Sequence, residues 1–405
     1  MKKMRNPQKI RYISVLSGAD LFLKFRNQGL KNEKRRIHMR NTFLEIDTQA
    51  IKYNLESIQK HVGKGVALFP VIKADAYGTG VESTQDALVQ AGIETVVVAI
   101  VDEAIELKNR GFTQDIIILN GLSPANTSEL CCVVDLGLIP AVSVLEVAEK
   151  LNEIAHALGK VQRIHVELET GMGRTGVKKE DMLDFVKKIS ALSNIEIEGM
   201  FSHFSSADSS PEYTARQLKI FKEVKDELSA NGYEFKYYHL AASSGIIAYP
   251  EAYFNAVRPG IILKGYYPSE DMRSMLSLKP ATKLKSEIVY IKDVEPGTAI
   301  SYSRTYVTDK PSRIATIPMG YADGLRRELS NRGRVLVNGQ YAPIVGSICM
   351  DNFMIDITGI DANLGDEIVL WDNDKITLEE IADICGTINY EILCGISERV
   401  PRVTV

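Results

Sequence analysis

From about residue 42 the sequence alternates short apolar runs with amphipathic stretches. Eight runs have the length and composition of β-strands: Ala67–Ala74, Thr95–Val101, Asp115–Asn120, Ile139–Ser143, Arg163–Glu169, Ile195–Phe204, Tyr237–Ala241 and Ala256–Lys264. Between them, apolar residues recur at three- and four-residue spacing, as in Ser83–Ala91, Asp102–Arg110, Val144–Leu158, Lys179–Leu192 and Tyr213–Ala230. Eight consecutive β-α repeats favour a closed (β/α)8 barrel of the TIM type over a doubly wound open sheet.

The pattern changes after about Pro280. Six short segments rich in β-branched residues follow, separated by turn residues: Lys285–Ile291, Arg313–Ile317, Arg334–Val337, Tyr341–Val345, Asn352–Ile357 and Glu367–Leu370. One helix-like run, Thr377–Cys385, interrupts them. We therefore expect an α/β barrel over residues 41–278 and a mostly β C-terminal domain over residues 279–405.

Residues 1–40 differ from the rest in charge. They hold twelve Lys and Arg against two acidic residues, which predicts a basic arm that is disordered or weakly helical. The apolar stretch inside it is broken by polar residues, so it is a poor secretory signal. Contact with an anionic surface or with nucleic acid is a second, less favoured interpretation, and a translation start at Met39 is a third.

Composition narrows the class of protein. The chain of 405 residues is 45% hydrophobic, which is enough for large buried cores. The net charge of −4 gives no reason to expect nucleic acid as a partner, and no apolar run reaches the ~18 residues that span a bilayer. Five cysteines without CxxC or metal-like spacing suit a reducing cytoplasm and predict no metal site.

Several polar residues follow the predicted strands, where barrels of this kind place their active sites. Lys73 closes an otherwise apolar run, and a desolvated lysine is suited to Schiff-base chemistry. The later strands lead to Arg174 among glycines, to His203 and to a turn with Ser243, and the eighth strand begins with Arg258 close to its start. Each of these has an ordinary structural explanation as a loop, a helix cap or a surface ion pair. Together they fit a cofactor with an aldehyde, a phosphate and a pyridine ring.

Several motifs in this order resemble those of the alanine racemases, which are pyridoxal-phosphate enzymes with a barrel and a C-terminal β domain. The resemblance extends from about Asn41 to Val405. It rests on Val71–Gly78, Gly171–Arg174, Val257–Gly260, Ser301–Tyr302, Ile317–Gly324, Cys349–Asp351 and Asn389–Glu391. The motif around Lys73 is the most specific of them, because it looks like the family's cofactor-attachment sequence.

The resemblance implies a role for each matching residue. Lys73 would bind pyridoxal 5'-phosphate as a Schiff base and act as one acid/base group, while Tyr302 of a partner subunit would be the other. Tyr77, Ser243, Tyr390 and the backbone of Gly260 and Ile261 would hold the phosphate. Arg258 would face the pyridine nitrogen, His203 would lie against the ring, and Arg174 would lie near the ring hydroxyl and the substrate. Tyr321, Met350 and Asp351 would shape the substrate pocket from the partner chain of a homodimer.

This inventory suits racemisation, which removes the Cα proton from one face and returns it on the other. The resemblance therefore implies an isomerase that interconverts L-alanine and D-alanine and supplies D-alanine for peptidoglycan. The chain departs from the family pattern at Glu167, where many members carry a carbamylated lysine, and also at Glu169 and Ala242. We expect Glu167 to replace the carbamate and to accept hydrogen bonds from Arg174.

Three other functions remain open from the sequence. A racemase for serine or a broader set of small amino acids is the main alternative, although related serine racemases tend to differ at Tyr390 and carry a membrane domain. A barrel-type amino-acid decarboxylase fits the motifs around Lys73 and Tyr302 less well. A pyridoxal-phosphate carrier without turnover would be expected to lack the β domain.

Overall fold

The computed structural model describes residues 40–372 and 374–405. The chain divides into two units, residues 1–41 and 42–405, and the fold described below is that of the second. The basic arm predicted for residues 1–40 therefore lies almost wholly outside the described residues. Within the described ranges, no helix is long and apolar enough to cross a membrane.

The predicted barrel is confirmed. Six parallel strands neighbour one another in chain order: β3 (Thr95–Val98), β4 (Asp115–Ile118), β5 (Ile139–Val142), β6 (Gln162–Glu167), β7 (Ile195–Phe201) and β8 (Tyr237–His239). The pair β2 (Ala67–Leu68) and β9 (Ala256–Val257) closes the ring, because single bridges join Val71 to Val97 and Ala242 to Arg258. This closure excludes the doubly wound alternative.

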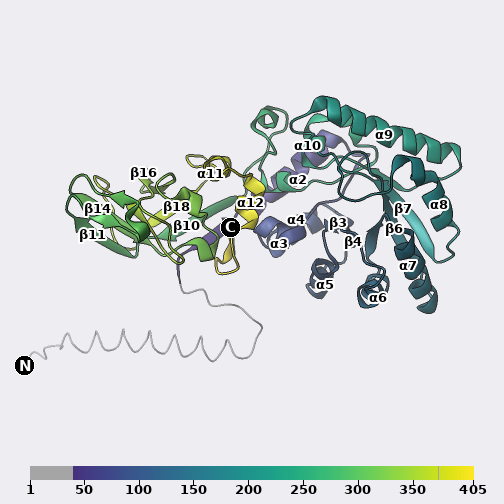
Figure 1. The fold of residues 1–405 in the computed structure, drawn as a ribbon, viewed down its shortest axis with the longest axis horizontal. Coiled ribbons are helices and arrows are strands. Elements are labelled where there is room, and N and C mark those ends of the chain that lie inside the picture. Colours follow the sequence, from purple (N-terminus) through teal and green to yellow (C-terminus); the bar gives the residue numbers. More distant parts are fainter. Residues whose placement is uncertain (1–39, 373) are drawn as a thin grey trace, which may run out of the picture. The chain divides into compact units, whose positions relative to one another are not determined.

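Amphipathic helices cover the outside of the strands (Figure 1). They are α2 (Thr48–Val62), α4 (Glu82–Gln90), α5 (Val101–Asn109), α6 (Thr127–Asp135), α7 (Leu145–Ala157), α8 (Met182–Ser190), α9 (Pro211–Ala230) and the short α10 (Ser243–Ala248). In α8 the buried residues are Met182, Phe185, Val186 and Ile189, which is the spacing of one helix face. The strands themselves are almost wholly buried, since helices lie on one side of them and the barrel interior on the other.

The chain leaves the strands earlier than predicted. Lys73 does not end a strand but begins α3 (Lys73–Gly78), and the predicted strand Ala256–Lys264 is β9 followed by the 3-10 turn η3 (Ile261–Lys264). In α3 four successive residues, Ala74 to Tyr77, have φ between 51° and 62°. Left-handed backbone costs an L-residue about 1–2 kcal/mol. Four such residues in a row cannot continue a strand, and their strain marks a functional site.

The C-terminal region is mostly β, as predicted. Its largest sheet has the order β16 (Gln340–Pro343), β15 (Arg334–Val337), β18 (Glu367–Trp371), β10 (Thr282–Glu287), β1 (Phe43–Ile46) and β19 (Arg402–Thr404). A second sheet contains β11 (Tyr290–Val294), β14 (Ser312–Ile317) and β17 (Phe353–Asp356), and β12 (Ala299–Ile300) pairs with β13 (Tyr306–Val307).

Two features of this region differ from the predictions. The predicted strand Lys285–Ile291 is the end of β10 and the start of β11, which lie in different sheets. The alternation of buried and exposed residues breaks there, because Val289 and Tyr290 are exposed in succession. In addition, β1 precedes the barrel in the sequence but pairs with β10 and β19 of the C-terminal sheet.

Two helices near the end of the chain matter for the site. α11 (Leu378–Cys385) is the predicted helix Thr377–Cys385, and α12 (Asn389–Cys394) follows it. α12 packs against α3 so closely that a Cβ on Gly78 would lie 2.7 Å from the carbonyl oxygen of Leu393. The C-terminal region thereby brings Tyr390 beside the turn that carries Lys73.

Candidate active site

A cavity of about 230 Å³ lies at the carboxyl ends of the barrel strands. It is lined by α3, by the loops after β4, β7, β8 and β9, and by α12. The lining residues are Val71, Lys73, Tyr77, Leu119, His203, Phe204, Ser205, Ala207, Asp208, Ala242, Ser243, Ser244, Gly245, Arg258, Gly260 and Tyr390. The structure therefore brings together most of the barrel residues and the one helix residue, Tyr390, that the sequence assigned to the site.

Lys73 is half-buried at one wall of this cavity. Burial lowers the pKa of its amine, and the positive charge of Arg174 lowers it further. The turn that carries it is tied to the segment after β3, because Glu103 accepts hydrogen bonds from the backbone N–H groups of Ala74 (2.7 Å) and Ala99 (2.8 Å). The result is a held lysine with an increased neutral fraction, which is the form that attacks a carbonyl.

Several hydroxyl groups surround Gly260 at another part of the cavity wall. Its N–H donates to the hydroxyl of Ser243 at 3.1 Å, and a Cβ at this position would collide with the hydroxyl of Tyr77. The rings of Tyr77 and Tyr390 meet edge to face with centroids 6.0 Å apart. Burial raises the pKa of both phenols, so they stay protonated and can donate hydrogen bonds. Three hydroxyl groups around a glycine, one of them held in place by the glycine N–H, form a cradle for an anion.

Arg258 lines the cavity from the barrel side and is 1% exposed. Its guanidinium donates to the carbonyl of Ser202 at 2.7 Å and to that of His239 at 2.8 Å. It also donates to Nδ1 of His239 at 2.5 Å and contacts Nδ1 of His203 at 3.2 Å. Burial, with the charge of Arg258 second, lowers the pKa of His203 to about 3, so this ring is neutral at physiological pH.

The predicted bond between Glu167 and Arg174 is not formed in the described chain. Arg174 is exposed, and Glu167 is 5% exposed with a side-chain hydrogen bond to Thr175. Burial raises the pKa of Glu167, while that bond and the charges of Arg174 and Arg258 oppose the rise. Glu167 thus interacts with both arginines through charge, not through a direct hydrogen bond. The backbone N–H groups of Gly171 and Gly173 bind Glu169 instead, which holds the loop before Arg174.

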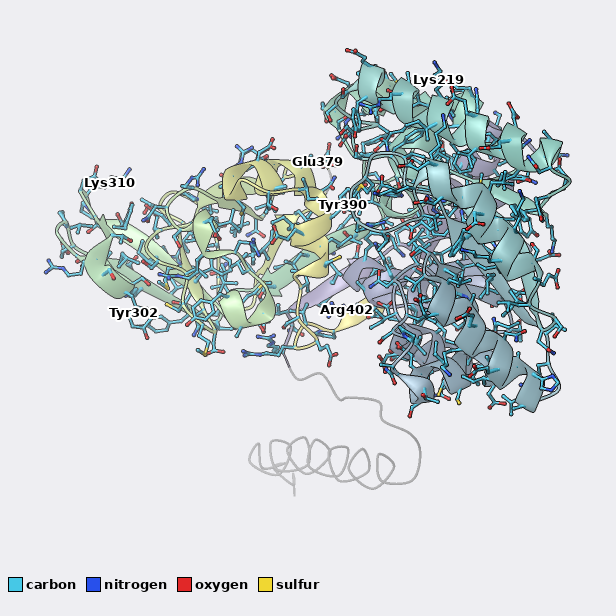
Figure 2. All side chains as sticks on the ribbon, turned by 45° about the vertical axis from the view of Figure 1, so that its right-hand side comes forward. Lys219, Tyr302, Lys310, Glu379, Tyr390 and Arg402 are labelled. Atoms are coloured by element: carbon cyan, nitrogen blue, oxygen red, sulfur yellow. The ribbon has the colours of Figure 1, made fainter. Side chains whose placement is uncertain are left out.

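The remaining predicted residues lie outside this cavity. Tyr302, Tyr321 and Met350 are exposed by 71%, 43% and 51%, and Figure 2 shows Tyr302 well away from Tyr390. They nevertheless belong to one cluster with Asp351. The N–H of Tyr321 donates to the carbonyl of Cys349 at 3.0 Å, and the hydroxyl of Ser347 donates to the carbonyl of Tyr302 at 3.1 Å. Ile261 is buried at the start of η3, next to Gly260.

Two residues of the site were missed by sequence reasoning. Glu103 holds the lysine turn from the first turn of α5, where an acidic residue reads as an ordinary helix N-terminus. His239, within β8, accepts a hydrogen bond from Arg258. Its position in an apolar run was a usable signal, because a buried polar side chain needs a hydrogen-bond partner.

Family models match nearly all of the described chain. The alanine racemase N-terminal domain matches residues 46–268, and the alanine racemase C-terminal domain matches residues 281–404. The alanine racemase of Halothermothrix orenii is 45% identical over 368 residues, which are 90% of this chain and 96% of that protein.

Solved structures agree. The alanine racemase of Clostridium difficile 630 is 39% identical with a TM-score of 0.87, and the match covers 91% of this chain and 97% of that one. The Bacillus anthracis alanine racemase, solved with bound L-Ala-P, is 33% identical with a TM-score of 0.84 over 90% and 95% of the two chains. Fold, site and sequence give one conclusion: this chain belongs to the alanine racemase family.

Proposed function

We propose that the protein is a pyridoxal-phosphate-dependent racemase that interconverts L-alanine and D-alanine. The observation that carries this proposal is the cavity in which a lysine of lowered pKa faces an anion cradle, in a chain of the alanine racemase family. No feature of the described cavity favours serine over alanine.

The residues present fit this cofactor. The cradle around Gly260 has only room for backbone, because a Cβ there would collide with Tyr77, and its donors suit a phosphate. Lys73 would hold the aldehyde end of the cofactor. The donor-only guanidinium of Arg258 would face the ring nitrogen and leave it without a proton, since a guanidinium cannot accept one.

Two side chains would move the proton of the substrate. Pyridoxal phosphate, when bound, withdraws electrons from the Cα carbon of the amino acid and so makes its proton acidic. The Nζ atom of Lys73 would take or return that proton on one face. The phenol oxygen of Tyr302 would do so on the other face, and His203, neutral at physiological pH, would pack against the ring without adding charge.

The position of Tyr302 favours a homodimer. Of the predicted acid/base pair, only Lys73 lines the cavity, while Tyr302 lies in an exposed cluster with Tyr321, Met350 and Asp351. A second copy that places this cluster over the cavity would complete the site. In such a pair each subunit gives its lysine to one site and its tyrosine to the other.

Purified protein incubated with L-alanine and pyridoxal phosphate is expected to form D-alanine, which D-amino-acid oxidase detects. L-Serine and other small L-amino acids in the same assay report the substrate range. A protein that binds the cofactor but leaves every L-amino acid unchanged would be a carrier and would contradict the proposal. A higher kcat/KM for serine would instead correct the substrate.

A second prediction concerns the buried charge of Glu167. Replacing Glu167 with glutamine keeps the shape and removes the charge that acts on Arg174 and Arg258. We expect turnover to fall by about tenfold, which corresponds to roughly one pKa unit of lost interaction. Because a glutamate needs no carbamylation, wild-type activity should not respond to dissolved bicarbonate. Glu180→Gln, at an exposed position nearby, is the matched control. Full activity of Glu167→Gln would show that this charge is not needed.

A further inference from the structure

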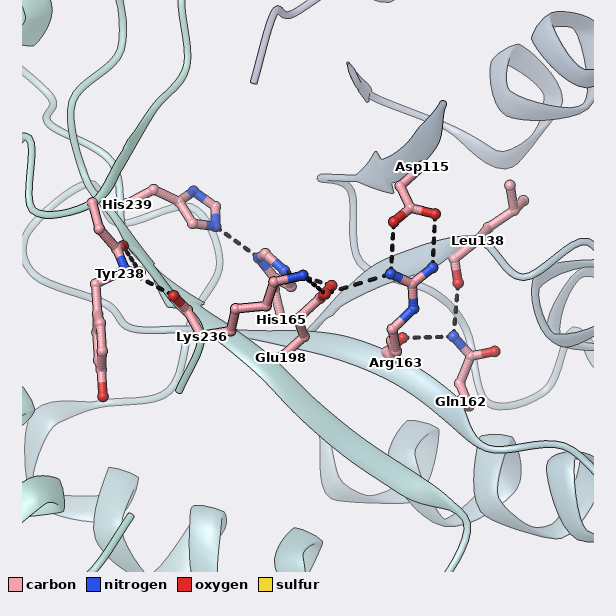
Figure 3. A network of polar contacts seen from close by, with 10 residues as sticks. Asp115, Leu138, Gln162, Arg163, His165, Glu198, Lys236, Tyr238 and His239 are labelled. Carbon is pink, nitrogen blue, oxygen red and sulfur yellow. Dashed lines mark hydrogen bonds and ion pairs between the residues drawn. The ribbon is translucent and has the colours of Figure 1, made fainter. Parts of the chain in front are cut away.

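A line of buried polar side chains runs from Arg258 through the barrel interior, away from the cavity. Nη1 of Arg258 contacts Nδ1 of His239 at 2.5 Å, and Nε2 of His239 contacts Nδ1 of His165 at 2.7 Å. Nε2 of His165 then lies 3.6 Å from Oε2 of Glu198. Figure 3 shows His239, His165 and Glu198 one after another along this line. Both imidazoles are 0% exposed and Glu198 is 4% exposed, so protein groups alone decide their protonation.

The hydrogen bonds along this line can run in only one direction, from Arg258 toward Glu198. A guanidinium only donates, so Nδ1 of His239 must be the unprotonated, accepting nitrogen. Burial lowers the pKa of His239 and of His165, so both rings are neutral and carry one proton each. The proton of His239 is therefore on Nε2 and is donated to His165, whose own proton must be on Nε2 as well. That proton faces Glu198, because Oε2 of Glu198 lies 3.6 Å from Nε2 of His165, just beyond hydrogen-bond length, and this nitrogen has no hydrogen-bond partner in the described chain.

Aromatic rings pack around His239 and Arg258 and fix their positions. The ring of Phe201 stacks on His239 with centroids 5.0 Å apart at 3°, and Phe69 meets the same ring edge-on at 5.5 Å. Arg258 lies over Phe201, 5.3 Å from its centroid. A Cβ at Gly199 would come within 2.7 Å of the His165 ring, so the residue after Glu198 has to be a glycine for the ring to fit.

The far end of the line is anchored by cations. Oε1 of Glu198 accepts from Lys236 at 3.1 Å and from Arg163 at 3.4 Å, and Arg163 also makes two bonds to Asp115, of 2.6 and 2.7 Å. These contacts and the nearby His165 outweigh burial and lower the pKa of Glu198 to about 2. Glu198 is therefore an ionised, acceptor-only group whose second oxygen is directed at His165.

We propose that Glu198 is a positioning residue: at the end of the line opposite Arg258 its carboxylate matches the tautomers of His165 and His239 that Arg258 requires, and so keeps the His239 acceptor of Arg258 in a fixed place. Only the last step, from Arg258 to the cofactor's ring nitrogen, rests on the proposed function. The tautomers belong to the polypeptide and are defined without it.

The substitution Glu198→Gln gives a sharp test. The amide oxygen would stay with Lys236 and Arg163, because both are donors, and the NH2 group would then face His165. That geometry requires His165 to accept at Nε2 and to carry its proton on Nδ1. His239 would have to accept in turn and place its own proton against Arg258, where two donors would oppose each other. The variant thus reverses the line and removes the imidazole acceptor of Arg258, while its carbonyl acceptors remain.

Nitrogen-15 NMR of the imidazole rings reads these states directly. The chain has only six histidines, and variants that each lack one histidine assign the signals. In the wild-type holoenzyme we expect both His165 and His239 to carry the proton on Nε2. In Glu198→Gln we expect His165 to change to the Nδ1-protonated form and the affinity for pyridoxal phosphate to fall by about tenfold, the scale typical of outer-shell partners.

Lys236→Met is the matched control, since it removes a charged partner of Glu198 but keeps the carboxylate. It should leave both tautomers unchanged. A proton on Nδ1 of His165 in the wild-type protein would overturn the proposal even if Glu198→Gln failed to fold. An unchanged His165 in a folded Glu198→Gln protein would overturn it as well. A reversed His165 tautomer without loss of cofactor affinity would overturn the proposed effect of Glu198 on Arg258, although it would show that Glu198 controls the tautomer. In each case the racemase assay reports separately on the proposed function.

Discussion

Replacing Lys73 with alanine is expected to abolish racemisation and covalent cofactor attachment together. The lysine would hold the aldehyde and move the proton on one face. The variant therefore loses an acid/base group, worth about 10²–10⁴ in rate, and the attachment point in addition. Racemisation should accordingly fall by at least about 10⁴-fold. His203 offers no replacement, because its ring is neutral with a pKa of about 3.

Borohydride reduction followed by peptide mass spectrometry measures attachment independently of turnover. In the wild-type protein the reduced cofactor should be found on the peptide that contains Lys73, and in Lys73→Ala on none. Lys150→Ala is the control, because Lys150 is an exposed lysine on α7 paired only with Glu153 among the described residues. Cofactor attached to another lysine, or an active Lys73→Ala protein, would refute the assignment.

Local pattern was sufficient to predict the barrel and the rim of its site. Each of the eight barrel strands lies within about one residue of a predicted apolar run, because strands buried on both sides are mostly apolar. Lys73, His203 and Ser243 stand at the C-terminal ends of such runs, and chain order alone places them at one end of a parallel barrel. Arg258 stood near the start of the predicted run Ala256–Lys264, and it reaches the same end because β9 stops at Val257. All four residues line one cavity.

Long-range and backbone features were beyond that reasoning. The pairing of β1 with β10 and β19 joins segments more than 200 residues apart, and no local period encodes it. The left-handed turn at Ala74–Tyr77 contains no glycine before Gly78, so propensity gives no signal for it. The predicted bond between Glu167 and Arg174 rested on analogy with a longer side chain, whereas Arg174 is exposed and Glu167 hydrogen-bonds to Thr175.

The largest effect after the loss of Lys73 is expected from Tyr302→Phe. The change removes one phenol oxygen from a side chain that is 71% exposed, so the fold should be unaffected. If this phenol serves the second face of the substrate, turnover should fall by about 10²–10⁴-fold. Proton removal from L-alanine should suffer more than removal from D-alanine, as measured by solvent-deuterium incorporation from each enantiomer.

Co-expression of Lys73→Ala and Tyr302→Phe chains with different tags tests whether the site is shared. In the purified heterodimer one site would combine both defects, while the other would combine the intact lysine of one chain with the intact tyrosine of its partner. We therefore expect about half of the wild-type activity from two variants that are each inactive as homodimers. If each chain built its site alone, both sites of the heterodimer would be defective and no activity would return. A monomeric wild-type protein with full activity would refute the shared site equally, because Tyr302 of the same chain lies outside the cavity that holds Lys73.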